Sequence, residues 1–217
     1  MLTGIRLANR QIIERATRSR ECHGMGTTVV GALFNEKSGK MYIGHVGDSR
    51  AYRLRDGQIS QMTRDHSLVN DYLQAMPELT EEQRSELPKN VITRALGMQE
   101  QVVVDLQGDD AQVGDLYVLC SDGLSGMIDD AEILDVVQGA PDLDEACRRL
   151  VALANEHGGE DNITALVVRI EPSLGEGAQL SSETLPRGAV WAREGETRPE
   201  PGSDAPPAGS VVGKPAI

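Results

Sequence analysis

Three aspartates lie at the ends of strand-like apolar runs, each with glycine nearby, and this repeated arrangement constrains the fold more than any other feature. They are Asp48 in "VGDSR", Asp122 in "LCSDGL" and Asp161 in "GGEDNIT". A carboxylate beside a buried strand is held rigidly, and an adjacent glycine lets backbone or solvent approach it closely. If these carboxylates converge at one end of a sheet, a divalent cation would relieve their repulsion. An all-oxygen ligand set suits Mg²⁺ or Mn²⁺.

Each of these acids alone would more often be structural, because Asp-Gly is common in turns and Asp-Ser or Asp-Asn is common in caps. The functional reading depends on all three sharing one pattern. By contrast, Asp56-Gly57 lies between two polar strand-like runs and is predicted to be a plain hairpin turn. His66 in "TRDHSL" is a candidate acid–base, although a histidine beside a surface insert more often has a hydrogen-bonding structural role.

The apolar periodicity predicts short strands mixed with helices. Strands are expected at 27–34, 41–46, 50–54, 58–62, 102–106, 116–120 and 162–170, and helices at 5–16, 129–137 and 142–157. The first four strands are joined by short turns, so we expect one antiparallel meander, which argues against an all-parallel sheet. The continuous apolar run at 116–120 is typical of a strand that is buried on both faces.

A polar insert with helical patterning interrupts the strands at about residues 66–90, and we expect it to form a mobile surface flap. Thr80 and Gln83 fit a capping box inside this flap. Further along the chain, Asp142 is a good N-cap for the helix at 142–157, with Glu145 at the third helical position.

The folded domain is expected to cover residues 1–170 and to be followed by a disordered tail at 171–217. The tail holds seven of the ten prolines and shows no periodicity. Trp191, the only tryptophan, lies in this tail. It is either an idle residue in a loose segment or part of a short docking motif.

Composition narrows the class of protein. The net charge of −13 argues against nucleic acid or an anionic membrane as a partner, because phosphate contacts need clustered Lys and Arg. No run reaches the roughly 18 apolar residues that span a bilayer. Three cysteines without CxxC spacing indicate a reducing compartment, so we expect a cytoplasmic protein.

Six motifs in order along the chain resemble those of the PPM-type (type-2C) metal-dependent protein serine/threonine phosphatases, in their bacterial form. The motifs are "GMGTT", "GHVGDSRAYRLRDGQI", "TRDHS", "VITRALG", "LCSDGL" and "GGEDNIT". The resemblance implies an α+β fold, the αββα sandwich of two antiparallel sheets flanked by helices, here lacking the N-terminal strands. It also implies hydrolysis of phosphoserine or phosphothreonine by a metal-activated water, without a phosphoenzyme.

The same resemblance implies the roles of individual residues. By position, Asp122 and Asp161 match ligands of the catalytic metal pair, and Asp48 with Asp122 matches the site of a third metal. Asn162 is expected to orient Asp161 without binding the metal itself. The implied cofactors are Mn²⁺ or Mg²⁺, as two catalytic ions with a third nearby, and no catalytic residue is expected beyond the metal ligands. The implied partners are phosphorylated proteins, among them a serine/threonine kinase and its substrates, with the chain itself a monomer.

The resemblance fails at the front of the chain. Family members carry a phosphate-binding arginine, an acidic stretch and an Asp-Gly-x-Gly-Gly motif whose aspartate bridges the catalytic metals, and none of these precedes "MLTGIRLANRQIIERA". We therefore expect a truncated sequence with weak or no activity. Two alternatives stay open: a non-catalytic PPM-like module that binds a phosphoprotein or kinase, and an inert fragment with exposed sheet edges.

Overall fold

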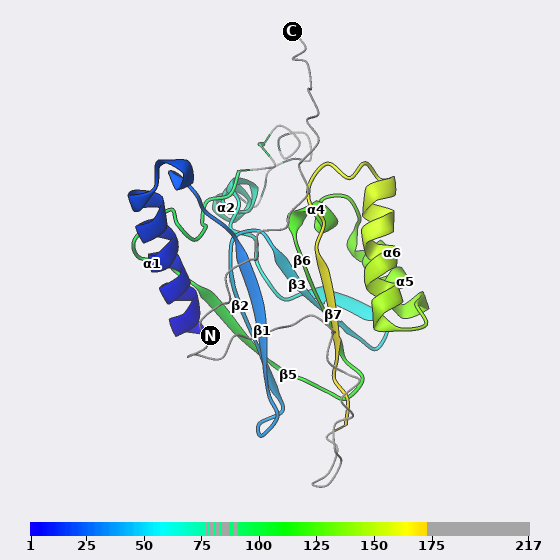
Figure 1. The fold of residues 1–217 in the computed structure, drawn as a ribbon. Coiled ribbons are helices and arrows are strands. Elements are labelled where there is room, and N and C mark those ends of the chain that lie inside the picture. Colours follow the sequence, from blue (N-terminus) through cyan, green and yellow to red (C-terminus); the bar gives the residue numbers. More distant parts are fainter. Residues whose placement is uncertain (77, 79, 81–82, 84–86, 89–90, 173–217) are drawn as a thin grey trace, which may run out of the picture. The chain divides into compact units, whose positions relative to one another are not determined.

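Two antiparallel β-sheets are flanked by helices on both outer sides, so the layers follow the order helix, sheet, sheet, helix (Figure 1). This computed structural model describes residues 1–172 except 77, 79, 81–82, 84–86 and 89–90. The predicted tail from residue 173 onward, with Trp191, and those parts of the predicted flap lie outside the described residues. The predicted α+β sandwich is confirmed.

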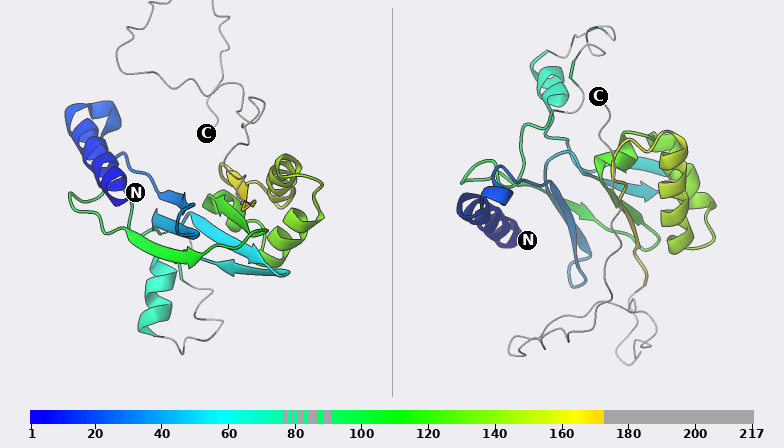
Figure 2. Two further views of the ribbon diagram at one scale, coloured as in Figure 1. Left: turned by 90° about the horizontal axis from the view of Figure 1, so that it is seen from below. Right: turned by 45° about the horizontal axis from the view of Figure 1, so that its top comes forward.

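The elements are short and follow one another through short connections, apart from the flap. They are α1 (Leu2–Arg18), the 3-10 turn η1 (Arg20–Cys22), β1 (Val29–Asn35), β2 (Lys40–Val46), β3 (Arg50–Arg55), β4 (Gln58–Gln61), α2 (Leu68–Ala75), β5 (Asp105–Asp110), β6 (Leu116–Cys120), α4 (Asp122–Ser125), α5 (Asp130–Gly139), α6 (Leu143–Glu156) and β7 (Ala165–Arg169). Helix α2, in the flap, projects away from the two sheets (Figure 2). None of the described helices is both long and apolar enough to cross a bilayer.

The predicted single meander is wrong, because the first four strands are divided between two sheets. The first sheet has the order β1-β2-β5 and the second the order β4-β3-β6-β7, with every pairing antiparallel. The chain leaves the first sheet after β2 and enters the second at β3 through the corner residues Gly47, Asp48 and Ser49. Gly47 has φ +110°, and a Cβ there would lie 2.4 Å from Cγ2 of Thr28. Only glycine allows the chain to turn out of the first sheet at this point.

The strand predicted at 102–106 is also misplaced, since β5 begins at Asp105. Val102 and Val104 instead pack with Ile5 of α1 in a small apolar cluster. The polar stretch that follows them pairs with β2. It tolerates polar residues because β5 is an edge strand that is largely exposed. Apolar patterning therefore located a partly buried segment before the strand and overlapped the strand itself only at Asp105 and Leu106.

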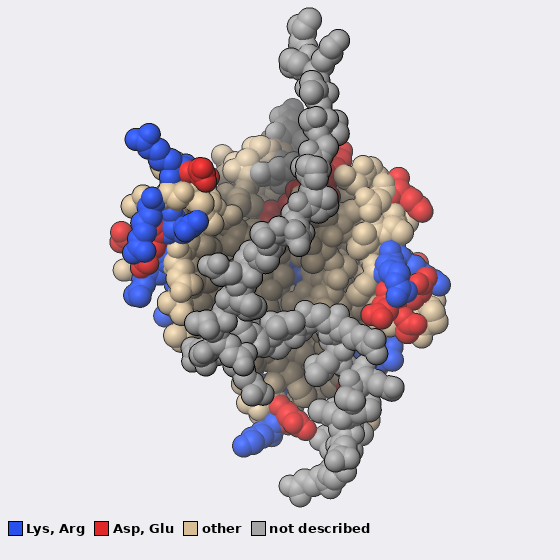
Figure 3. Space-filling view, viewed as in Figure 1, with Lys and Arg blue, Asp and Glu red and all other residues tan. Residues whose placement is uncertain are grey.

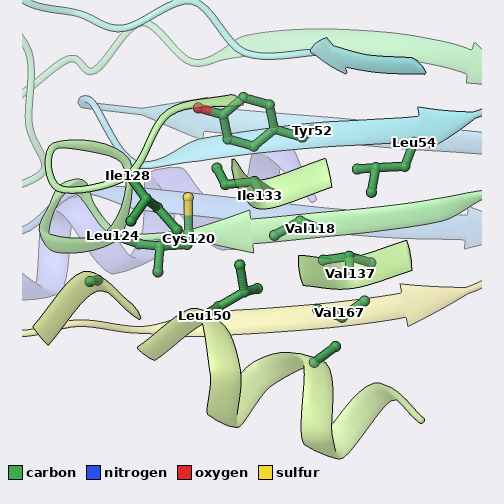
Figure 4. Packing of buried hydrophobic residues seen from close by; sticks show 12 residues of the cluster. Tyr52, Leu54, Val118, Cys120, Leu124, Ile128, Ile133, Val137, Leu150 and Val167 are labelled. Carbon is green, nitrogen blue, oxygen red and sulfur yellow. The ribbon is translucent and has the colours of Figure 1, made fainter. Parts of the chain in front are cut away.

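Three apolar clusters join the layers. The cluster between the sheets contains Met41, Ile43, Ala51, Met62, Tyr117, Leu119 and Ile170. The cluster between the second sheet and helices α5 and α6 includes Tyr52, Leu54, Val118, Cys120, Ile133, Val137, Leu150 and Val167 (Figure 4). The third, under α1, contains Ile5, Val46, Leu96 and Val102. Because β6 supplies residues to the first two clusters, the prediction that it is buried on both faces is confirmed.

The predicted local stops and turns are present. Oδ1 of Asp142 accepts a hydrogen bond from the backbone N–H of Glu145 at 2.7 Å. Thr80 and Gln83 form the reciprocal hydrogen bonds of a capping box, at 3.0 and 3.3 Å. The Asp56–Gly57 hairpin turn has φ of 51° and 75°, so both residues adopt the left-handed conformation of a type I′ turn.

Charged side chains of both signs are intermixed on the outer helices (Figure 3). On α1, Glu14 pairs with Arg10 and Arg18, and on α6, Glu145 pairs with Arg149. These pairs are spaced four residues apart along each helix and are exposed, so each contributes little to stability.

A buried ion pair closes the end of the second sheet that lies opposite the Asp48 corner. Asp115 is only 2% exposed and receives hydrogen bonds from the Arg55 guanidinium and from the backbone N–H of Gln112. Burial alone would raise the pKa of Asp115, but these hydrogen bonds outweigh it and hold the pKa below its ordinary value of 3.8. The pair therefore stabilises the folded chain when Asp115 is ionised.

Replacing this aspartate tests the ion pair. Asp115→Asn should lower the free energy of unfolding by about 3 kcal/mol near neutral pH, because it removes the buried carboxylate charge that Arg55 contacts most closely. A lowered pKa in the folded state means that the contribution is complete above the unfolded-state pKa, and is lost as the pH falls through the folded-state pKa. Urea unfolding curves of wild type and variant should therefore converge below about pH 3.

Asp110→Asn is the matched control, because Asp110 pairs with Lys40 on the exposed surface. It should leave the urea curve nearly unchanged. Equal destabilisation by the two substitutions would contradict a special role for the buried pair.

Candidate metal centre

The second sheet places the three predicted ligands at the same end. The first residue of β3 lies opposite the last residue of β6, and that residue of β6 lies opposite the first of β7. Asp48 lies two residues before β3 begins, and Asp122 lies two residues after β6 ends. Asp161 lies in the segment that leads into β7. The antiparallel register therefore brings all three aspartates just beyond one end of the sheet, as the sequence pattern predicts.

Hydrogen bonds join the loops that carry two of these aspartates. Oγ of Ser121 donates to the carbonyl of Asn162 at 3.1 Å and accepts from the N–H of Thr164 at 3.0 Å. The N–H of Ser121 also donates to the carbonyl of Thr164 at 3.1 Å. A Cβ at Gly123 would lie 2.4 Å from the carbonyl oxygen of Asn162, so the close approach of the two loops needs glycine.

Backbone amides orient the two carboxylates on these loops. Oδ1 of Asp122 accepts from the N–H of Gly123 at 3.0 Å, and Oδ1 of Asp161 accepts from the N–H of Asn162 at 2.6 Å. Asn162 thus contacts Asp161 through its backbone. Its predicted role as a support for a metal ligand stays a prediction.

Neighbouring carboxylates repel the charge of Asp48 in this structure. Burial raises the pKa of Asp48 above its ordinary value, and the negative charges of Asp122 and Asp65 raise it further. A bound cation would offset both the burial and the repulsion. The donors at this end are carboxylate oxygens, which fit the hard cations Mg²⁺ and Mn²⁺.

A second polar cluster lies beside the corner that carries Asp48. Ligand atoms of His45, His66 and Asp105 lie within 4.8 Å of one another. In the part of the chain that the structure describes, no other three such side chains come so close, the predicted aspartates included. Arg94 already neutralises this cluster, because its Nη1 donates to Oδ1 of Asp105 at 2.8 Å and lies 3.0 Å from Nε2 of His66. We interpret the cluster as an ion-pair network.

His66 has the structural role that was the alternative to acid–base chemistry. It is only 5% exposed, and both ring nitrogens have partners. Nδ1 accepts from the N–H of Gly47 at 3.0 Å, and Nε2 lies 3.2 Å from Oδ2 of Asp105. A general acid or base needs a nitrogen that can reach substrate or water, and neither nitrogen is free to do so.

The sequence analysis missed the ion pair beneath the site. The Arg50 guanidinium donates to both carboxylate oxygens of Asp65 at 2.7 to 3.0 Å, and Gln61 donates to the same carboxylate at 3.0 Å. Arg50 and Asp65 lie within the motifs "VGDSR" and "TRDHS". Their presence in two site motifs was the available signal, but only the fold shows that they pair.

Comparison with known proteins places these features among phosphatases. Residues 4–72 match the family Protein phosphatase 2C. The serine/threonine phosphatase stp of Listeria welshimeri is 38% identical over 164 residues, which are 76% of this chain and 64% of that protein. The chain thus spans less than two thirds of the length of this relative.

Solved structures show the same fold. The serine/threonine phosphatase of S. agalactiae superposes with a TM-score of 0.71 at 40% identity, over 79% of this chain and 69% of that one. The catalytic domain of the phosphatase PstP in complex with two manganese ions superposes with a TM-score of 0.66 at 34% identity, over 77% of this chain and 68% of that one.

The contact at Gly123 gives a test of the site geometry. Gly123→Ala should force the two loops apart, lower the free energy of unfolding by about 1–3 kcal/mol and weaken Mn²⁺ binding. Thermal unfolding and calorimetric titration with Mn²⁺ measure the two effects.

Gly4→Ala in α1 is the control, because a Cβ added at Gly4 would have no neighbouring atom within 4 Å. It should stabilise the helix by up to about 1 kcal/mol and leave Mn²⁺ binding unchanged. Unaltered Mn²⁺ binding by Gly123→Ala would show that the loop contact does not set the site.

Proposed function

Because this chain belongs to the protein phosphatase 2C (PPM) family, we propose that it is a metal-dependent phosphatase of phosphoserine and phosphothreonine in proteins. The observation that carries the proposal is the gathering of Asp48, Asp122 and Asp161 beyond one end of the second sheet. The solved relative with two manganese ions supports Mn²⁺ as a cofactor, with Mg²⁺ as the alternative that the oxygen donors also suit.

The residues of this chain would divide the work as follows. Asp122 and Asp161 would hold catalytic metal, and Asp48 with Asp122 would hold a third ion. When bound, such ions supply an activated water and neutralise charge on the phosphoryl oxygens. Ser121 would keep the Asp122 loop in contact with the Asp161 loop through its hydrogen bonds. The ion pair of Arg50 with Asp65 lies near the carboxylates, and its two charges compensate each other.

The sequence of the chain bears on how fast it would turn over substrate. The 217 residues contain no Asp-Gly-x-Gly-Gly motif, so the chain as written lacks a ligand that would bridge two metals. We therefore expect slow turnover. The same observation favours a second candidate function, a non-catalytic module that binds a phosphoprotein or a kinase partner.

The cellular setting is inferred from weaker features. The substrates would be phosphorylated proteins, among them a serine/threonine kinase and its targets, which would place the chain in signal transduction as a monomer. All three cysteines are free, and this supports a reducing compartment such as the cytoplasm.

Hydrolysis of a phosphothreonine peptide by the full chain tests the proposal. Phosphate release should be slow, should require Mn²⁺ or Mg²⁺, and should fall to the metal-free level in Asp122→Asn, because this substitution removes a ligand charge from the site. Asp56→Asn is the control: this aspartate lies in the distant hairpin turn, where asparagine also tolerates positive φ.

Two results would contradict the proposal. Turnover that Asp122→Asn leaves unchanged would exclude the assigned metal ligands. Tight binding of the phosphopeptide without any metal-dependent hydrolysis would favour the non-catalytic module.

A further inference from the structure

The corner between the two sheets presents a specific structural problem. Gly47 turns the chain from β2 toward β3, and its N–H and C=O point away from the regular pairing of either sheet. Buried backbone N–H and C=O groups need hydrogen-bond partners, and an unpaired one costs about 1–3 kcal/mol. The N–H of Gly47 belongs to its peptide unit with Val46 and the C=O to its unit with Asp48, so fixing both units fixes the backbone angles of Gly47 and the direction in which Asp48 leaves the corner.

One residue satisfies both polar groups of Gly47. The ring Nδ1 of His66 accepts from the Gly47 N–H at 3.0 Å, and the backbone N–H of His66 donates to the Gly47 carbonyl at 2.9 Å. A backbone N–H always donates, so Nδ1 must be unprotonated and Nε2 must carry the proton of a neutral ring. Burial lowers the pKa of His66 and favours this neutral form.

The imidazole ring is itself held on its face and on its far edge. It stacks on His45, with 4.7 Å between ring centroids and 13° between planes. His45 is anchored by its Nε2, which lies 2.7 Å from the carbonyl oxygen of Arg64. On the far edge, Nε2 of His66 lies 3.2 Å from Oδ2 of Asp105 and 3.0 Å from Nη1 of Arg94, which donates to the other oxygen of Asp105. The position of the ring is therefore fixed from three directions, and its tautomer is set by the N–H of Gly47.

We propose that His66 is a positioning residue that fixes the backbone of Gly47 on both sides of its Cα and thereby aims the Asp48 carboxylate into the metal centre. The inference rests on the proposed role of Asp48 as a metal ligand. It assigns His66 no proton transfer and no contact with substrate. The expected signature is specific: loss of the Nδ1 acceptor should weaken metal binding at Asp48, whereas loss of a comparable buried hydrogen bond elsewhere should not.

Two substitutions separate the functions of the two ring nitrogens. In His66→Asn the side-chain oxygen takes the place of Nδ1 and can still accept from Gly47. In His66→Gln the amide takes the place of Nε2, toward Asp105, and Gly47 loses its acceptor. The affinity of the full chain for Mn²⁺ at its weakest site should fall about tenfold in His66→Gln and stay within about threefold in His66→Asn. Calorimetric titration with Mn²⁺ measures both affinities.

Thr63→Val is the matched control for the loss of a buried acceptor. Oγ1 of Thr63 accepts from the buried N–H of Ala51 at 3.0 Å, in the same region but away from the corner. This variant should lose stability as His66→Gln does and should keep wild-type Mn²⁺ affinity. Amide hydrogen exchange supplies a readout independent of metal: the Gly47 N–H should be protected in wild type and His66→Asn, and should exchange faster in His66→Gln.

The outcomes distinguish this inference from the proposed function. Asp48→Ala should abolish the weakest Mn²⁺ site. If it does not, or if wild type binds no Mn²⁺, the ligand assignment fails and the positioning role fails with it. If Asp48→Ala abolishes the site but folded His66→Gln binds Mn²⁺ like wild type, only the positioning role is overturned. An equal loss of Mn²⁺ affinity in Thr63→Val would also overturn it, because a general loss of stability would then explain the weaker binding.

Discussion

The arrangement depends on the burial of β6 on both of its faces. Tyr117 and Leu119 fill the space between the sheets, while Val118 and Cys120 pack toward α5 and α6. A slip of one residue would exchange these two sets of side chains between two differently shaped cores, so the register with β3 and β7 is strongly specified. Asp122 and its neighbouring aspartates take their positions from that register. Apolar packing along the strand thus places the charged groups at its end.

Ion pairs made by strand β3 also favour this arrangement of the two sheets. The strand carries three arginines, and each pairs with an acid from a different segment. The pairs are Arg50–Asp65, Arg53–Asp109 and Arg55–Asp115. The middle pair joins β3 of the second sheet to β5 of the first, and its aspartate also accepts from the hydroxyl of Tyr117 at 2.7 Å. An arrangement that separated these partners would leave partly buried charges uncompensated, so the pairs disfavour alternative ways of stacking the two sheets.

Local patterns predicted most elements and the positions of the candidate ligands, because strands, caps and Asp-Gly turns depend on neighbouring residues. The change of sheet at Gly47 could not be predicted, since a glycine corner looks the same in a hairpin and in a crossing between sheets. The stretch 102–106 has the pattern of a strand because Val102 and Val104 pack under α1 while Val103 between them is exposed, which gives the same alternation. The partners of His66 and Arg50 lie on segments that only the tertiary fold brings together.

The flap leaves and re-enters the domain at a single point. The N–H of Leu68 donates to the carbonyl of Val91 at 2.9 Å, and Ser67 forms a bridge with Ile92. When both ends of an insert are joined in this way, doubling its length adds only about 0.6 kcal/mol of closure entropy. Insertions and deletions between these ends are therefore cheap in free energy. Evolution can vary the flap in length and sequence while the corner and the aspartates stay in place.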